Sequence, residues 1–271
     1  MATLKLAYDA DANLRDGRPV LVLLHGFTQD RTAWDGVRDG LRRIGPTVAV
    51  DLIGHGASPK PDDPEPYRMD ACLGQLDALL ATLGVSRAWW VGYSMGGRTA
   101  LHMAVRRPER VDGLVLISAT AGFRELEARA ERMRNDEALA DRLPGWGIEA
   151  FVDYWLALPL FEGLSRLPQH QQDHIRRQRL TNDPVALGHS LRGMGTGATQ
   201  SLWGNLRELN LPTLVMAGEL DERYCTLARS MVAALPQAHL SILPDCGHAV
   251  LLEGPERFQR ALVEFFQRLE G

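Results

Sequence analysis

The stretch "WWVGYSMGGRTAL" at residues 89–101 holds a serine between an apolar run and two glycines. Its segment "GYSMGG" matches the pattern Gly-x-Ser-x-Gly, in which a serine lies in a sharp turn between a strand and a helix. The apolar residues before it predict a buried strand with Trp89 and Trp90 in the core, and the residues after it favour a helix. The glycines let neighbouring backbone approach closely, so the pattern predicts that the hydroxyl of Ser94 is exposed and reactive.

The fold class follows from similar apolar runs that recur along the chain. They are "PVLVLLHGF", "TVAVDLIGHG", "GLVLISA", "PTLVMAGELD" and "AHLSILPDCGH". Runs of this kind are typical of strands that are buried on both faces, as in a parallel sheet. Helical stretches such as "MDACLGQLDALLATLG" lie between them and end at a glycine. The alternation predicts an α/β fold, with a mostly parallel sheet and helices on both of its faces.

One segment, residues 123–207, breaks this alternation because it contains no run that predicts a buried strand. "ELEARAERMRNDEALADRL", "IEAFVDYWLALPLF" and "DHIRRQRLTNDPVALGHSLRGM" all have helical, amphipathic patterns, joined by breaks that contain Pro and Gly. We therefore expect a helical cap at 123–207, inserted into a core formed by 1–122 and 208–271. Within the cap, "RLPGWGIEAF" is expected to carry a variable loop.

The composition argues against several classes of protein. The 271 residues carry a formal net charge of −4, which does not indicate a surface for nucleic acid or anionic lipid. The first residues lack the apolar core of a signal peptide, and no apolar window approaches a membrane-spanning length. The three cysteines are too few for a disulfide framework, and we expect them to be buried and inert. We expect a cytoplasmic protein with no membrane span, as a monomer or small homo-oligomer.

A reactive serine needs a base, and that base needs a carboxylate to orient it. Asp221 in "VMAGELDERY" follows one predicted strand, and His248 in "LPDCGHAVLLEGPERF" follows another. Both positions are loops at the carboxyl ends of strands, where parallel sheets build their sites. We therefore predict that Ser94, Asp221 and His248 form a catalytic triad.

An oxyanion formed beside this serine needs hydrogen-bond donors. The N–H of Met95, the residue after the serine, is one expected donor. The loop in "LLHGFTQD" follows an earlier predicted strand, and the N–H of Phe27 is expected to be the other donor. We interpret His25 and His55 as structural residues that brace their loops.

The motifs "LLHGF", "DLIGHGAS", "GYSMGG", "GELD" and "CGHAVLLEGPERF" together resemble the α/β-hydrolase superfamily over nearly the whole chain. The resemblance implies the α/β-hydrolase fold and a Ser-His-Asp triad. It does not specify the reaction, because this fold supports many chemistries.

Arginines near the predicted site indicate what it binds. Arg98 lies four residues after Ser94, one helical turn away and close to the pocket wall. The cap carries further arginines, most of which we interpret as solvated helix charges: Arg129, Arg132, Arg134, Arg176, Arg177 and Arg179. Clustered guanidinium groups suit bidentate recognition of carboxylates. We therefore expect a small anionic substrate with several carboxylates.

A second, tighter resemblance supports this expectation. "GYSMGGR", "EARAERMRND", "FVDYWLALPLF", "LRGMGTGATQSLW" and "GELDERY" resemble the 2-succinyl-6-hydroxy-2,4-cyclohexadiene-1-carboxylate synthases of menaquinone biosynthesis. The resemblance implies a carbon–oxygen lyase that eliminates pyruvate from 2-succinyl-5-enolpyruvyl-6-hydroxy-3-cyclohexene-1-carboxylate. It implies that Ser94 removes a proton and relays it to His248, with no metal or organic cofactor. The implied substrate-binding residues are Tyr93, Arg98, Arg132, Trp155 and Arg179.

Two other interpretations stay open. A carboxylesterase or a carbon–carbon-bond hydrolase could use the same triad with a different pocket. A non-catalytic binding protein could share the fold, although it would have no need of a base relay. The run "HIRRQRLTND" offers several registers, so which of its arginines faces the pocket also stays open.

Overall fold

The fold is built on a seven-stranded sheet. The computed structural model describes residues 4–270 of the chain. The strand order is β1-β3-β2-β4-β5-β6-β7, and every neighbouring pair is parallel except β1 and β3. This confirms the mostly parallel sheet that the apolar runs predict. The strands are β1 (Tyr8–Ala10), β2 (Leu21–Leu24), β3 (Thr47–Val50), β4 (Ala88–Tyr93), β5 (Val111–Ile117), β6 (Thr213–Gly218) and β7 (Ala238–Leu243).

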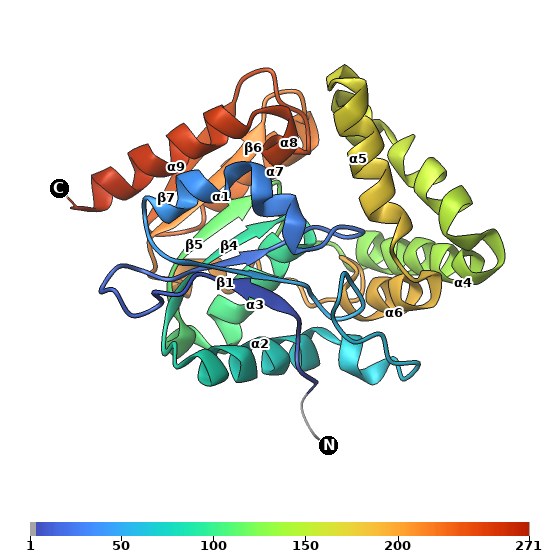
Figure 1. Cartoon of the computed structure of the whole chain (residues 1–271), viewed down its shortest axis with the longest axis horizontal. Helices are drawn as coiled ribbons and strands as arrows, with labels where there is room; N and C mark the ends of the chain where they lie inside the picture. The colour runs from blue at the N-terminus through green and yellow to red at the C-terminus, as the bar shows by residue number, and fades with distance from the viewer. Residues whose placement is uncertain (1–3, 271) are drawn as a thin grey trace.

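Helices cover both faces of this sheet, as Figure 1 shows. In β4, Trp89 and Val91 pack into the core on one face, whereas Trp90 packs into the core on the other. Because successive side chains of a strand point to opposite faces, a strand covered on both sides needs an unbroken apolar run. The first face is covered by α1 (Asp35–Arg42), α8 (Val250–Glu253) and α9 (Pro255–Glu270), and the second by α2 (Met69–Leu83), α3 (Met95–Arg106) and α7 (Glu222–Val232).

The chain between β5 and β6 forms no strand. It contains α4 (Leu126–Leu156), a 3₁₀ helix (Pro159–Arg166), α5 (Gln169–Leu180) and α6 (Pro184–Met194). Figure 1 shows α4, α5 and α6 grouped beside the sheet. The division of the chain into a cap at 123–207 and a surrounding core stays a prediction.

The cap helices differ from the sequence-based expectation in one respect. The run "DHIRRQRLTNDPVALGHSLRGM" has a continuous helical pattern, but the structure divides it into α5 and α6. Pro184 disfavours a helical conformation at the residue before it, so Asp183 is extended and begins a new helix. The carboxylate of Asp183 accepts a hydrogen bond from the N–H of Ala186 at 2.9 Å, which caps α6.

A second interruption lies inside α4. Gly147 has φ 74° and ψ 166°, so the backbone leaves the helical conformation there and the element is two helices joined at a kink. A positive φ of this size suits glycine, which has no Cβ. The kink falls within "RLPGWGIEAF", where the sequence analysis expects a variable loop.

Two further expectations concern the chain as a whole. Among the described residues, no helix is both long enough and apolar enough to cross a membrane. Cys72, Cys225 and Cys246 are buried and free, as expected, and burial raises the pKa of each thiol, which makes it less reactive.

The packing between α3 and β2 depends on one glycine. A Cβ added to Gly96 would lie 2.1 Å from the carbonyl oxygen of Leu24, and neither backbone can yield without moving the sheet or the helix. Gly74 in α2 is also helical, but the nearest atom to a Cβ there is 3.9 Å away, at the end of the Arg107 side chain.

We therefore predict opposite effects for two Gly→Ala substitutions within helices. Gly96→Ala should lower the free energy of unfolding by about 1–3 kcal/mol, because the added methyl group overpacks the contact with β2. Gly74→Ala should raise it by about 0.5–1 kcal/mol, because alanine favours a helix and the site is open. Urea denaturation of both variants measures these free energies of unfolding. A change of the same sign and size in the two variants would contradict the prediction.

Candidate active site

Ser94 lies at the sharp turn between β4 and α3. Its φ of 52° and ψ of −108° are uncommon for a residue with a Cβ, so the surrounding structure must hold the turn. The N–H of Ser94 donates to the carbonyl oxygen of Ile117 at 2.8 Å, which ties the turn to β5. A Cβ on Gly92 would lie 2.3 Å from the carbonyl oxygen of Gly96. The glycines of the motif therefore permit this close crossing of backbone, as the sequence predicts.

The structure brings Ser94, His248 and Asp221 into one chain of hydrogen bonds. The Nε2 atom of His248 lies 3.2 Å from the Oγ of Ser94, and its Nδ1 lies 2.8 Å from Oδ2 of Asp221. With Nδ1 protonated, the imidazole donates to the carboxylate and leaves Nε2 to accept the serine proton. The other oxygen of Asp221 accepts from the N–H of Tyr224 at 3.1 Å. This geometry suits proton transfer from Ser94.

The two expected oxyanion donors flank the serine. Phe27 and Met95 line the same cavity as Ser94. In the part of the chain that the structure describes, the N–H of Phe27 donates no hydrogen bond. Met95 is the first residue of α3, where backbone N–H groups have no intrahelical partner. Their role as oxyanion donors stays a prediction.

His25 and His55 brace loops next to the site. The Nε2 atom of His25 accepts from the N–H of Leu52 at 3.0 Å, and its Nδ1 donates to the carbonyl oxygen of Gly26 at 2.8 Å. The Nδ1 of His55 donates to the carbonyl oxygen of Ile53 at 3.0 Å. Burial lowers the pKa of both imidazoles, that of His55 to about 3, so both rings are neutral at pH 7.

A cavity of about 410 Å³ lies above Ser94, between the sheet and the cap. All of the predicted substrate-binding residues line it, together with the serine, the histidine and the expected oxyanion donors. Asp221 lies behind His248 and does not line it. The predicted residues that line the cavity are Phe27, Tyr93, Ser94, Met95, Arg98, Arg132, Trp155, Arg179 and His248. In "HIRRQRLTND", the inward-facing arginine is therefore Arg179.

Two cations in this cavity are buried without a carboxylate partner. Arg98 is 6% exposed and Arg179 is 2% exposed, and neither forms an ion pair within residues 4–270. Arg98 donates to the carbonyl oxygen of Met194 and leaves its Nε unpartnered, and Arg179 donates to the Oγ1 of Thr28 at 3.1 Å. Burial lowers the pKa of each guanidinium to about 10, so both stay charged at pH 7.

Arg132 reaches the cavity with an acidic partner that the sequence analysis did not identify. Its Nε donates to Oδ1 of Asp136 at 2.7 Å, which pairs the two side chains within α4. Burial raises the pKa of the Asp136 carboxyl. The spacing of four residues within a predicted helix was the signal that could have identified this pair.

Aromatic side chains surround the histidine. The rings of Tyr93 and Tyr224 have their centroids 5.5 Å and 4.5 Å from that of His248. Burial raises the pKa of both phenols, so each hydroxyl stays protonated and able to donate. The indole N–H of Trp155 is also buried and has no hydrogen-bond partner among the described residues. Tyr224 and its neighbour Arg223 line the cavity but were missed, although they lie only three and two residues after Asp221 in the sequence.

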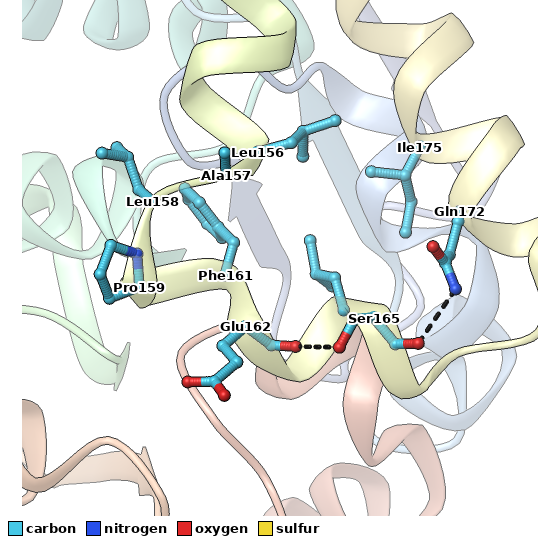
Figure 2. A pocket seen from close by; sticks show the side chains of 10 residues that line it. Leu156, Ala157, Leu158, Pro159, Phe161, Glu162, Ser165, Gln172 and Ile175 are labelled. Carbon is cyan, nitrogen blue, oxygen red and sulfur yellow. Dashed lines mark hydrogen bonds between the residues drawn. The ribbon is translucent and has the colours of Figure 1, made fainter.

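A second cavity of about 450 Å³ lies within the cap, beside the first (Figure 2). The two cavities share Leu158, Pro159 and Phe161 as a common wall. Glu162 is the only charged residue that lines the second cavity, which is otherwise mainly apolar. Its chemistry does not suit an anion, so the polycarboxylate site expected from the arginines is the cavity above Ser94.

Among residues 4–270, no group of three or more His, Cys, Asp and Glu side chains is placed so that it could hold a metal ion.

Comparison with known proteins identifies the family. Residues 19–255 match the family model described as the alpha/beta hydrolase fold. A Bacillus subtilis (strain 168) protein named as a 2-succinyl-6-hydroxy-2,4-cyclohexadiene-1-carboxylate synthase is 37% identical over 245 residues, which are 90% of this chain and 89% of that protein. The synthase of Serratia proteamaculans (strain 568) is 29% identical over 249 residues, 92% of this chain and 93% of that protein.

A solved structure agrees with these relatives. MenH from S. aureus superimposes with a TM-score of 0.92 at 32% identity, over 97% of this chain and 99% of that one. Both resemblances inferred from the motifs are thereby confirmed. The chain belongs to the α/β-hydrolase fold family and, within it, to the family of 2-succinyl-6-hydroxy-2,4-cyclohexadiene-1-carboxylate synthases.

Proposed function

We propose that this protein is a lyase that eliminates pyruvate from 2-succinyl-5-enolpyruvyl-6-hydroxy-3-cyclohexene-1-carboxylate to give 2-succinyl-6-hydroxy-2,4-cyclohexadiene-1-carboxylate, in menaquinone biosynthesis in the cytoplasm. The observation that carries the proposal is the pair of buried, unpaired guanidinium groups of Arg98 and Arg179 beside Ser94. An isolated buried charge is costly, and a substrate with several carboxylates would supply the missing partners.

The reaction begins with a proton transfer. The Oγ of Ser94 accepts a proton from substrate carbon as its own proton moves to Nε2 of His248, 3.2 Å away. The carboxylate of Asp221 stabilises the imidazolium that forms. The electron pair of the broken C–H bond forms a new C=C bond in the ring, the existing ring double bond shifts, and the C–O bond to the enolpyruvyl oxygen breaks. The leaving pyruvate enolate takes up the proton held by His248 and becomes pyruvate, which restores the free histidine, so no water is consumed.

Negative charge develops on substrate oxygen during this step. The N–H groups of Phe27 and Met95 are proposed to stabilise that oxygen, as they would an acyl oxyanion. Arg98, Arg132 and Arg179 are proposed to hold the carboxylates of the substrate. Tyr93 and the indole N–H of Trp155 supply neutral donors, and both are free to do so.

The same triad could support ester or carbon–carbon-bond hydrolysis, so the reaction must be tested directly. We expect the purified protein to release pyruvate from the enolpyruvyl substrate without added metal, as measured by coupling to lactate dehydrogenase and NADH absorbance. Rapid hydrolysis of p-nitrophenyl acetate with no release of pyruvate would favour an esterase. A binding protein would turn over neither compound, and its Ser94→Ala variant would bind the substrate unchanged.

The role of Asp221 gives a second prediction. Asp221→Asn should lower kcat on the order of 10⁴-fold, because an amide at this position favours the wrong tautomer of His248 and cannot stabilise the imidazolium. The matched control is Asp77→Asn, which changes a carboxylate paired with Arg107 and Arg110 that does not line the cavity. Its kcat should equal that of the wild type. A fall of less than tenfold in Asp221→Asn would remove Asp221 from the triad.

The unpaired charge of Arg98 gives a third prediction, in which activity and stability change in opposite directions. Arg98→Met should lower kcat/KM about thirtyfold, which corresponds to a loss of about 2 kcal/mol of transition-state stabilisation, because a charged hydrogen-bond partner of the substrate is lost. The same change should raise the free energy of unfolding by about 1 kcal/mol, because a buried charge without a partner is removed.

Arg38→Met is the control for this pair of effects. Arg38 is equally buried, but it pairs with Asp9 at 2.6 Å and donates to the Oγ1 of Thr47 at 2.8 Å, away from the cavity. Its substitution should lower the free energy of unfolding by about 1 kcal/mol and leave kcat/KM unchanged. A loss of stability in Arg98→Met would mean that its charge is compensated in the free protein.

A further inference from the structure

A third cavity, of about 490 Å³, lies at the other end of α3 from Ser94. Its walls come from the start of α2 and the residues just before it, the second half of α3, the start of α4, and the end of α6 with the segment that follows. It shares no residue with the cavity above Ser94, so it is a separate space. Its lining is polar and includes three arginines against two carboxylates.

Two of these arginines have no acidic partner. Arg106 donates to the side-chain oxygen of Gln200 at 2.8 Å. Arg129 donates to the carbonyl oxygens of Gly197 and Ala198 at 2.9 and 3.3 Å. Neither forms an ion pair within the described residues, and each guanidinium retains N–H groups for a further acceptor.

The start of α2 adds backbone donors to the same space. Met69, Asp70 and Ala71, the first three residues of this helix, all line the cavity, and no side chain caps them. Free N–H groups at a helix N-terminus favour an anion. Of the two acidic groups, Glu65 is 3.1 Å from Arg68 and is neutralised by it, and Asp70 is exposed at the rim.

An independent observation inside the cavity points to a ligand. His102 lines the cavity and is 2% exposed, and its Nδ1 is buried with no hydrogen-bond partner between residues 4 and 270. Burial, together with the charges of Arg98 and Arg106, lowers the pKa of His102 to about 3. With Nδ1 protonated, the neutral ring offers a buried N–H that lacks an acceptor within the described chain. Buried polar groups without partners are rare in proteins and call for an explanation.

We propose that this cavity is a second anion site, which binds a small oxyanion such as phosphate or a carboxylate between Arg106, Arg129, His102 and the N-terminus of α2. The site is separate from the catalytic cavity, but residues that line the two spaces are neighbours along α3 and α6. His102 lies one turn after Arg98 on α3. Gly193, which lines the site, precedes Met194, whose carbonyl oxygen accepts from Arg98. An anion bound here would therefore affect how Arg98 is held, through Gly193 and the hydrogen bond of Arg98 to Met194.

Calorimetric titration of the full chain tests the proposal, with inorganic phosphate and succinate as separate probes at constant ionic strength. We expect at least one of the two to bind, and the Arg106→Gln/Arg129→Gln variant to weaken that binding about tenfold or more. Arg134→Gln is the matched control, since this arginine is exposed on α4, forms no ion pair within the described chain and lies outside the cavity. The unfolding temperature of each variant checks its fold.

Arg179→Gln distinguishes the two anion sites, because Arg179 lines only the catalytic cavity. Binding that survives Arg179→Gln and is weakened by the double variant supports the second site. Binding that is lost in Arg179→Gln and kept in the double variant would overturn the proposal, as would an absence of binding by both probes. The ring nitrogens of ¹⁵N-labelled His102 should also shift when the binding probe is added, and an unchanged spectrum would contradict the site.

Discussion

The turn at Ser94 is the constraint on which the rest of the site depends. A residue with a Cβ holds a positive φ there only because β4, α3 and β5 fix the backbone around it. The same turn directs the hydroxyl toward His248 and starts the helix that carries Arg98 one turn later. One local backbone conformation therefore positions both the proposed base and one of the proposed substrate-binding cations.

Much of the fold could be predicted from local patterns. The central strands β2 to β6 are largely continuous apolar runs because helices cover both faces, and residues such as Trp89 and Trp90 fill opposite cores. The run "AHLSILPDCGH" was wrongly predicted to be buried on both faces, because β7 lies at the edge of the sheet and is mostly not buried. Ser94, Asp221 and His248 could be placed because each follows a predicted strand. The break between α5 and α6 was missed because Pro184 interrupts a pattern that is apolar and periodic on both sides of it.

The partners of the arginines could not be predicted in the same way. Whether a cap arginine is solvated, paired or buried depends on contacts between elements that are distant in the sequence. Arg176 pairs with Asp153 at the surface, whereas Arg179, three residues later, is buried against Thr28 in the core. The sequence could identify which arginines are candidates to bind the substrate. Only the three-dimensional arrangement shows which of them form a salt bridge and which are buried without a partner.

The wall between the two neighbouring cavities has a consequence for how substrate range can change. The centroid of the Phe161 ring lies 6.0 Å from that of the His248 ring. The guanidinium carbon of Arg179 lies 5.7 Å from the same Phe161 centroid. On its other side lies an apolar space about as large as the catalytic cavity (Figure 2). Shortening this side chain would remove the aromatic part of a wall to which Leu158 and Pro159 also contribute. The fold thus places an apolar space next to a cationic one, so changes in this wall are where the protein could come to accept a substrate that combines a carboxylate with a bulky apolar group.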